Sequence, residues 1–405
     1  MLIKMMSVYA MRSISGLGTL FAILLIGRFY TSVELAAYAL FMLMLNFFTV
    51  IVLWGDTVKV VEDYNKAESE GHNKIVLLLG HKLLDGGVVL LLSYFILNYV
   101  GQWHNGLLAV VPIAIGGVFS ALLVAQKKFV SSILCYEFSR AVVPFLAMVM
   151  VASVYSGMAF NSLLSVSYLS LFLVLPLLLG YLSRQRAWTV SFAVNLKQWA
   201  IDKANALPVV LPQIIIVLVV QADRLVIEYW GSANELAAYF AAQTLYAIVL
   251  IVSHSTFNLV IPEVSKVAAL GVGDLRKQSM LMFKVQTLLG LLLIPIAYGF
   301  FKLIDVDQTI SMQVFVLLVG GGFLSSFFGV GLPAMQFCSN KMPYLKVILM
   351  GLVLQCLVVI SLYMALGVHA AALGFATYNV FTTVFAACYW HRRNVLVVPF
   401  FVFRG

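Results

Sequence analysis

A few ionisable side chains lie inside long apolar stretches of this 405-residue chain. They are Arg28, Glu137, Arg140, Asp223, Arg224, Glu228 and His254. A charge in the middle of a hydrocarbon layer costs about 3 kcal/mol by insertion scales, so each predicts either a nearby partner or a role in moving a charged substrate or ion.

Four of these groups form two possible pairs, each on one helix. Glu137 and Arg140 are three residues apart, and Arg224 and Glu228 are four apart, so each pair could neutralise itself locally. Asp223 is then left over. We therefore expect Asp223 to be the main carboxylate that couples transport to a proton or sodium gradient, since such a group must change its charge or ligand during a cycle.

Glu137 and His254 are further candidates for ion coupling. The ring of His254 stands between Ser253 and Ser255 and has a proton affinity suited to the task, but a hydrogen-bonded packing histidine is the simpler explanation.

The three arginines, Arg28, Arg140 and Arg224, predict a site for an anionic substrate. A guanidinium binds phosphate oxygens in pairs and does not lose its proton, so a cavity that holds arginines favours a pyrophosphate over a neutral drug. The alternatives are that Arg28 extends to the headgroups of the outer leaflet and that the other two form the local ion pairs.

The composition places these residues in a lipid bilayer. Hydrophobic residues make up 63% of the chain, charged residues 10%, and the mean hydropathy is +1.03. A water-soluble protein needs more charge on its surface, so we expect an all-α integral membrane protein. Polar breaks predict twelve spans, near 10–30, 35–58, 83–103, 106–125, 130–155, 160–183, 206–230, 235–261, 281–302, 310–334, 345–366 and 369–390.

The basic residues predict the orientation. With both termini in the cytoplasm, all of the 25 lysines and arginines fall on the cytoplasmic side except Lys302, outside, and the three arginines within spans. This asymmetry and attraction to anionic lipids account for the net charge of +9, without nucleic acid as a partner. We expect the first span to be retained and not cleaved as a signal peptide.

A short repeat predicts two related halves. The word ELAAY occurs at 34–38 and again at 235–239, each time at the first outside hairpin of a six-span half. Chance is the alternative, since Leu, Ala and Tyr are common in membrane proteins. We expect two pseudo-symmetric six-helix lobes, 1–183 and 206–405, around a central cavity, with a cytoplasmic linker at 184–205.

The linker predicts a helix in the membrane interface. Trp188, Phe192, Leu196 and Trp199 recur at helical spacing among basic residues, the pattern of an amphipathic interfacial helix.

Two hairpins resemble a known family. The first, GRFYTSVELAAYALFMLMLNFFTVIVLWG, resembles the opening of the O-antigen and polysaccharide flippases, where an arginine, a short turn, a Glu and a Tyr precede a long apolar span. The second, LPQIIIVLVVQADRLVIEYWGSANELAAYFAAQTL through VIPEVSK, is similar to the family's later hairpin, with Asp223 at its charged position and Pro262 at its closing proline. The first turn departs from the family pattern, because residues 30–33 replace its usual glycines and proline.

The resemblance implies a function. These flippases, of the multidrug, oligosaccharidyl-lipid and polysaccharide exporter superfamily, move undecaprenyl-pyrophosphate-linked oligosaccharides across the bacterial inner membrane, which implies membrane lipids, a polysaccharide polymerase and a chain-length regulator as partners. The expected mechanism is alternating access with no cofactor, neither ATP nor a metal.

Two other functions stay open. A cation-coupled multidrug exporter of the same superfamily would present an acidic or aromatic cavity. A membrane glycosyltransferase or polymerase would need a catalytic carboxylate at the outer surface, for which the candidates are Glu34, Glu235, Asp305 and Asp307. Neither Walker nor HExxH nor GxSxG motifs occur, and the four cysteines show no metal-binding spacing.

Overall fold

The computed structural model describes residues 2–54, 60, 75–99, 104–126, 128–155, 158–183, 188–191, 195–270, 273–304, 306–336, 338 and 342–398. Nearly all of the described chain is helical, as expected for backbone whose polar groups must be satisfied internally in lipid.

The elements of the first half of the chain include two short strands and several broken helices. They are α1 (Leu2–Phe29), α2 (Ser32–Leu53), β1 (Ile75–Leu78), α4 (Leu79–Tyr99), η1 (Asn105–Ala109), α5 (Val110–Ala125), α6 (Phe129–Ile133), η2 (Leu134–Phe138), α7 (Ser139–Val154), α8 (Phe160–Leu169), α9 (Leu171–Ser183) and β2 (Trp188–Ser191).

The second half begins with two very long helices. Its elements are α10 (Leu196–Trp230), α11 (Ala233–Leu270), β3 (Gly273–Asp274), α12 (Arg276–Leu303), α13 (Gln308–Ser326), α14 (Gly331–Met335), α15 (Met342–Leu366), α16 (Val368–His391) and β4 (Val395–Leu396).

The prediction of an all-α membrane fold is confirmed. Within the described residues, nine helical segments are long and apolar enough to cross a bilayer: 32–53, 105–125, 130–154, 160–177, 210–230, 276–303, 308–326, 342–366 and 368–391. The other predicted spans fall on α1, α4 and α11, so each of the twelve overlaps a helix or a run of helices.

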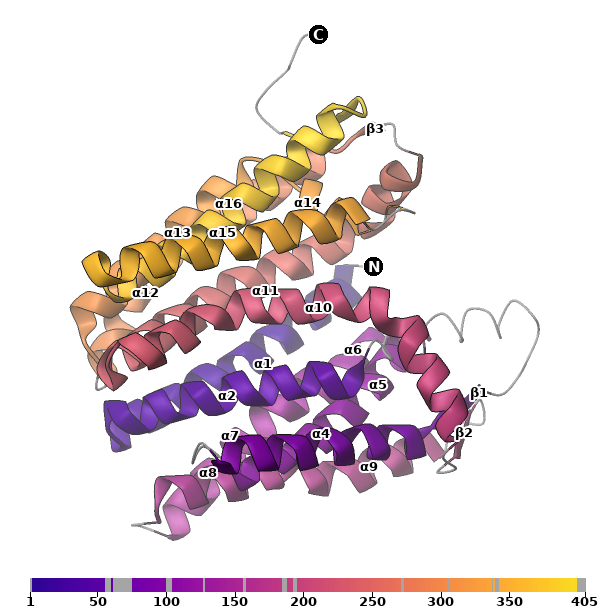
Figure 1. Ribbon diagram of the computed structural model, residues 1–405, viewed down its shortest axis with the longest axis vertical. Helices are drawn as coiled ribbons and strands as arrows, with labels where there is room; N and C mark the ends of the chain where they lie inside the picture. Colours follow the sequence, from indigo (N-terminus) through magenta and orange to yellow (C-terminus); the bar gives the residue numbers. More distant parts are fainter. Residues whose placement is uncertain are drawn as a thin grey trace. The chain divides into compact units, whose positions relative to one another are not determined.

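The chain divides into two compact units, which do not follow the sequence order strictly. One comprises residues 1–22 and 40–217, and the other comprises 23–39 and 218–405. In the first unit, α7 packs on α8, and α5 packs on α4, α6 and α9. In the second unit, α16 packs on α13 and α15, and α13 also packs on α11 and α12. The helices of each unit can be followed by colour in Figure 1.

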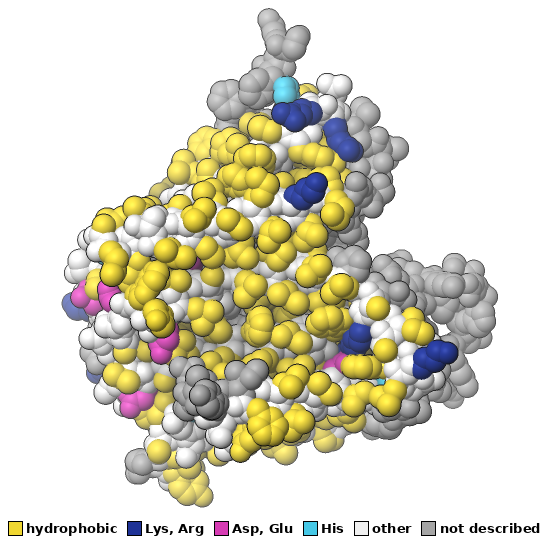
Figure 2. All heavy atoms as spheres, in the orientation of Figure 1, with side chains coloured by type: hydrophobic (Ala, Val, Ile, Leu, Met, Phe, Trp, Pro, Cys, Tyr) yellow, Lys and Arg dark blue, Asp and Glu magenta, His cyan; other side chains and the backbone are white. Residues whose placement is uncertain are grey.

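The surface is apolar over broad areas. Large hydrophobic side chains are exposed along many helices, with Met364 on α15 and Leu173 on α9 among the most exposed. On the face seen in Figure 2, hydrophobic side chains cover most of the described surface and charged side chains lie toward its edges. Such a surface suits contact with acyl chains, and together with the apolar helices it indicates a multi-pass membrane protein.

The linker prediction is wrong in part. Trp188–Ser191 is not helical but forms strand β2, which pairs in parallel with β1 in the register Ile75↔Trp188. Helix begins only at Leu196, where it continues into the predicted span as α10. The β-branched and aromatic residues of WTVS favour a strand once a second strand offers hydrogen bonds, and helical spacing alone could not reveal that partner.

Trp390, at the end of α16, is buried inside its own unit. Its side chain is fully buried, and its indole Nε1 donates to Gly331 O at 2.8 Å. Trp390 therefore packs α16 against α14.

Candidate functional site

The strongest candidate site is a polar cluster around Asp223 in the unit formed by residues 23–39 and 218–405. The Asp223 side chain is fully buried on α10. The Tyr239 hydroxyl of α11 donates to its Oδ2 at 2.6 Å, and Gln355 Nε2 of α15 donates to its Oδ1 at 2.7 Å. A buried carboxylate needs such donors, because desolvation otherwise costs several kcal/mol.

Arg224 follows directly and is also buried. Its Nε donates to Gln243 Oε1 at 2.8 Å, and its guanidinium carbon lies 4.6 Å from the ring centre of Phe240. The local pair with Glu228 does not form; Glu228 is exposed on the same helix. In this structure Arg224 faces Phe240 and Gln243, and its Nη1 is buried without a hydrogen-bond acceptor.

Gln355 also has a second role in the cluster. The same Nε2 donates to Val219 O at 2.8 Å, while Gln355 Oε1 is buried without a donor. Oε1 of Gln221, on α10, is likewise buried without a donor. The cluster thus combines one carboxylate, one guanidinium and unused donors and acceptors, which is a composition suited to binding or exchanging a charged species.

Both copies of the repeated word end at this cluster. Tyr239 closes the second ELAAY and donates to Asp223. Tyr38 closes the first, is also buried, and its ring meets that of Phe240 edge-on at 5.8 Å. The two copies also touch near their starts, where the Ser32 hydroxyl donates to Asn234 Oδ1.

The glutamates of the repeat are helix caps. Glu34 Oε2 accepts from Thr31 N at 3.0 Å, and Glu235 Oε2 accepts from Ser232 N at 2.9 Å. In the second copy the Ser232 hydroxyl accepts from Glu235 N in return, which completes a capping box. Asp307 caps α13 by accepting from Ile310 N. Three of the four candidates for the catalytic carboxylate of a glycosyltransferase therefore cap helices. The fourth, Asp305, lies outside the described residues.

Glu137 and Arg140 lie on a helix that is locally widened. Glu137 is in η2, a π-helical turn between α6 and α7, and both side chains are half-buried. Arg140 Nη1 contacts the Tyr136 hydroxyl at 3.4 Å, and its guanidinium carbon lies 5.9 Å from the Tyr136 ring centre. An inserted π turn re-aims the side chains around it and is frequent at functional sites.

The contacts described for Asp223 and Arg224 include none of the other predicted site residues. Arg28 is exposed in the last turn of α1, a position that suits the alternative in which its side chain extends to the headgroups of the outer leaflet. His254 lies in α11, and its side chain is outside what the structure describes. Arg140 belongs to the other compact unit, so the convergence of the three arginines stays a prediction.

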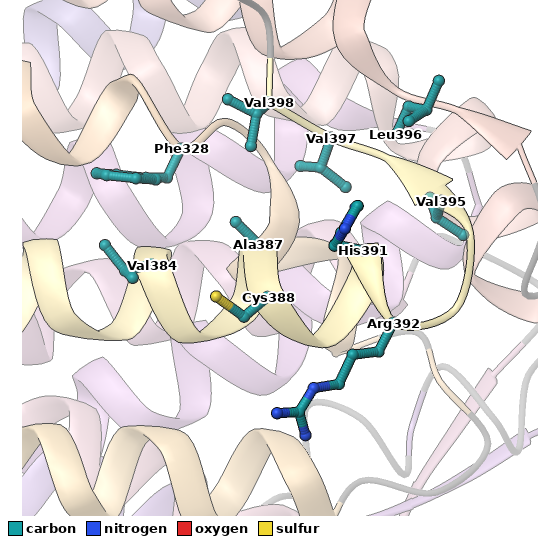
Figure 3. A pocket seen from close by; sticks show the side chains of 10 residues that line it. All are labelled: Phe328, Val384, Ala387, Cys388, His391, Arg392, Val395, Leu396, Val397 and Val398. Atoms are coloured by element: carbon teal, nitrogen blue, oxygen red, sulfur yellow. The ribbon is translucent and has the colours of Figure 1, made fainter. Parts of the chain in front are cut away.

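A separate hollow of about 260 Å³ lies at the end of α16. Figure 3 shows its lining, which is apolar apart from Cys388, His391 and Arg392 and includes Val397 from the segment after β4. It contains none of the predicted site residues. Among the described residues, no three His, Cys, Asp or Glu side chains are close enough to hold a metal ion.

Comparison with known proteins identifies the fold. No family model and no curated protein matches the sequence. Solved structures do match. One is an inward-facing multidrug resistance MATE family transporter of the MOP superfamily, with a TM-score of 0.65 and 14% sequence identity. The match covers 96% of this chain and 94% of that one. The lipid II flippase MurJ, in an inward closed conformation, has a TM-score of 0.66 at 11% identity, covering 97% and 90%.

This chain has the MATE and MurJ transporter fold. The Vibrio cholerae MATE transporter VcmN in its bent form also matches, with a TM-score of 0.55 at 11% identity over 96% of this chain and 98% of that one. Since both kinds of transporter are matched over nearly the whole chain, the fold by itself does not distinguish a drug exporter from a lipid flippase.

Sequence reasoning missed the partners of Asp223 and Arg224. Tyr239 and Gln355, which bond Asp223, and Gln243, which bonds Arg224, are polar residues within apolar helices, and that placement is the signal that could have found them. Asp85 was missed altogether, although it stands three residues after Lys82 at the start of an apolar helix.

Proposed function

We propose that this protein is a flippase for polyprenyl-pyrophosphate-linked oligosaccharides, such as undecaprenyl-linked O-antigen or capsule repeat units, in a bacterial inner membrane with both termini in the cytoplasm. The observation that carries the proposal is the presence of arginines inside spans of a MATE and MurJ fold, above all Arg224, whose buried guanidinium keeps an unused donor. An arginine held in the bilayer is costly and suits an anionic substrate.

The proposed mechanism is alternating access of two lobes, 1–183 and 206–405, joined by the linker at 184–205. Arg28, Arg140 and Arg224 would contact the pyrophosphate, while the polyprenyl tail stays in lipid. Arg224 is enclosed by Phe240 and Gln243 here, so it would meet substrate only in a conformation in which this packing loosens. A polymerase and a chain-length regulator would act on the product.

Asp223 is the proposed coupling carboxylate, with Glu137 and His254 as secondary candidates. The two donors on Asp223 come from α11 and α15, so a change in its charge would alter the packing of three helices in one unit. A proton or sodium ion bound there would thus be linked to conformation. Asp223→Asn is expected to leave the protein folded and to remove the response of transport to an ion gradient.

The test uses purified protein in liposomes and a fluorescent polyprenyl-pyrophosphate oligosaccharide. Arg140→Ala is expected to lower transport at least tenfold and Arg140→Lys to restore it in part, because an ammonium lacks the paired donors of a guanidinium. Arg392→Ala, at an exposed position, is the matched control and should not change transport. Undiminished transport by Arg140→Ala and Arg224→Ala would disprove pyrophosphate capture by these arginines.

A second candidate, a cation-coupled multidrug exporter, is favoured by one observation. Aromatic residues lie beside the neighbouring Asp223 and Arg224, since Tyr239 bonds Asp223, the Phe240 ring faces the Arg224 guanidinium, and the Tyr38 ring packs against Phe240. Acidic and aromatic groups together attract organic cations. The same liposomes loaded with a cationic dye distinguish the two: dye export driven by a gradient, without movement of the pyrophosphate lipid, would favour the exporter.

A further inference from the structure

A second buried ionic cluster lies in the other compact unit, at residues that the proposed function does not use. Asp85 on α4 is 6% exposed. Its Oδ2 accepts from Lys82 Nζ at 2.6 Å and from Lys203 Nζ at 2.7 Å, and its Oδ1 accepts from Trp199 Nε1 at 2.7 Å. Two ammonium groups thus share one buried carboxylate, an arrangement that a surface ion pair seldom shows.

The same residues also join a third helix. Lys82 Nζ donates to Val52 O at 2.9 Å, in the last turn of α2, where helix carbonyls have no partner of their own. Trp54 Nε1, just after α2, donates to Lys203 O at 3.0 Å. Ammonium groups are favourable at a helix C-terminus, so the end of α2 adds to the attraction that holds Lys82 in place.

A further contact lies at the very start of α10. His81 Nε2 accepts from Asn195 N at 3.1 Å, one residue before the helix begins. All of these residues belong to the same compact unit, and together they tie the ends of α2, α4 and α10 to one another. We call Asp85, Lys82, Lys203 and Trp199 the Asp85 latch.

Helix α10 extends from this latch to the candidate transport site. Its residues up to Val217 belong to the unit of Asp85, and from Leu218 onward, including Asp223 and Arg224, they belong to the other unit. Two prolines, Pro208 and Pro212, lie between the latch and the site. Each removes a backbone hydrogen bond and weakens the helix locally, so the first turns of α10 need an anchor of their own.

We infer that Asp85 is a positioning residue for transport: through the Asp85 latch it fixes the first turns of α10, the helix that carries Asp223 and Arg224. A latch made of buried charges suits this task, because a buried charge that loses its partner is strongly destabilised, and this holds the first turns of α10 to α4. The anchoring of α10 stands on its own contacts, and only its effect on transport rests on the proposed function.

The first test is hydrogen exchange of the purified full-length protein, which needs no substrate. Lys203→Met keeps the ion pair of Lys82 with Asp85, so the fold should persist. The amides of residues 196–207 are expected to exchange at least tenfold faster than in the native protein. Lys203→Arg should restore protection, because a guanidinium also bonds a carboxylate. Lys197→Met, at an exposed lysine on the same helix, is the matched control.

A second pair of variants tests whether Lys203 belongs to the Asp85 latch or whether Lys82 and Asp85 form an ion pair within α4 alone. Asp85→Asn removes the carboxylate that both ammonium groups share, and adding Lys203→Met removes one of these two buried charges, so the double variant should be better protected than Asp85→Asn alone. Equal exchange in the single and double variants, or unchanged exchange in Lys203→Met, would overturn the latch.

The transport arm uses the liposome assay with the pyrophosphate lipid. Transport is expected to fall at least fivefold in Lys203→Met and to return in Lys203→Arg, with Lys197→Met unchanged. Faster exchange without any change in transport would leave α10 anchored by Asp85 but would refute the positioning role. If the native protein moves no pyrophosphate lipid, the proposed function fails, and the exchange experiment still decides the latch.

Discussion

The hydroxyl of Tyr239 provides the sharpest test of the cluster around Asp223. It donates to Asp223 Oδ2 at 2.6 Å, both side chains are fully buried, and Gln355 supplies the only other donor that the structure shows on that carboxylate among the described residues. Tyr239→Phe removes one of these two donors and leaves the ring in place.

The expected cost follows from the charge on the acceptor. A hydrogen bond to a charged group contributes about 1.5–3 kcal/mol, and a buried carboxylate that loses a donor recovers none of this from water. Tyr239→Phe should therefore lower the free energy of unfolding by about that amount, which is roughly a 10- to 140-fold shift in the unfolding equilibrium.

Tyr246→Phe is the matched control. Tyr246 lies on the same helix, α11, and is equally buried, but its hydroxyl faces the neutral amide of Gln286 and not a carboxylate. Removing a hydroxyl that faces only a neutral group costs at most about 0.5–1.5 kcal/mol, which is less than the loss of a bond to a charged group. Both variants can be measured by reversible unfolding in mixed micelles, followed by tryptophan fluorescence. A loss in Tyr239→Phe within about 0.5 kcal/mol of the loss in Tyr246→Phe would refute the view that Asp223 depends on this donor.

Two further predictions concern packing and helix starts. In the run of three glycines on α13, a Cβ at Gly321 would clash with Ala376 Cβ, whereas a Cβ at Gly320 would meet nothing within 4 Å. Gly321→Ala should therefore destabilise the protein by about 1–3 kcal/mol in the same unfolding assay. Gly320→Ala should be neutral or slightly stabilising. Glu235→Ala removes the capping box with Ser232 and should cost about 1 kcal/mol, with transport retained in liposomes; complete loss of transport in a folded protein would show that Glu235 does more than cap α11.

The sequence by itself determined the solvent and the class of fold. Helices that must satisfy their own backbone in lipid leave a strong linear record of apolar stretches about 20 residues long, so the twelve predicted spans fall on helices. The repeated ELAAY also carried local information, because a capping box depends only on residues three apart. The sequence also identified Asp223 and Arg224, because a charged residue within an apolar stretch is visible without knowledge of the tertiary structure.

Only the tertiary structure decided which partners those charges take. Arg224 bonds Gln243 instead of the nearby Glu228, and Asp223 bonds Tyr239 and Gln355, the latter 132 residues away. Spacing along one helix cannot show which face a neighbouring helix covers. WTVS likewise became a strand only because Ile75–Leu78 offered it a partner, and Asp85 gained its importance only when α10 brought Lys203 and Trp199 to it. Long-range pairing of this kind depends on packing, which a linear pattern does not record.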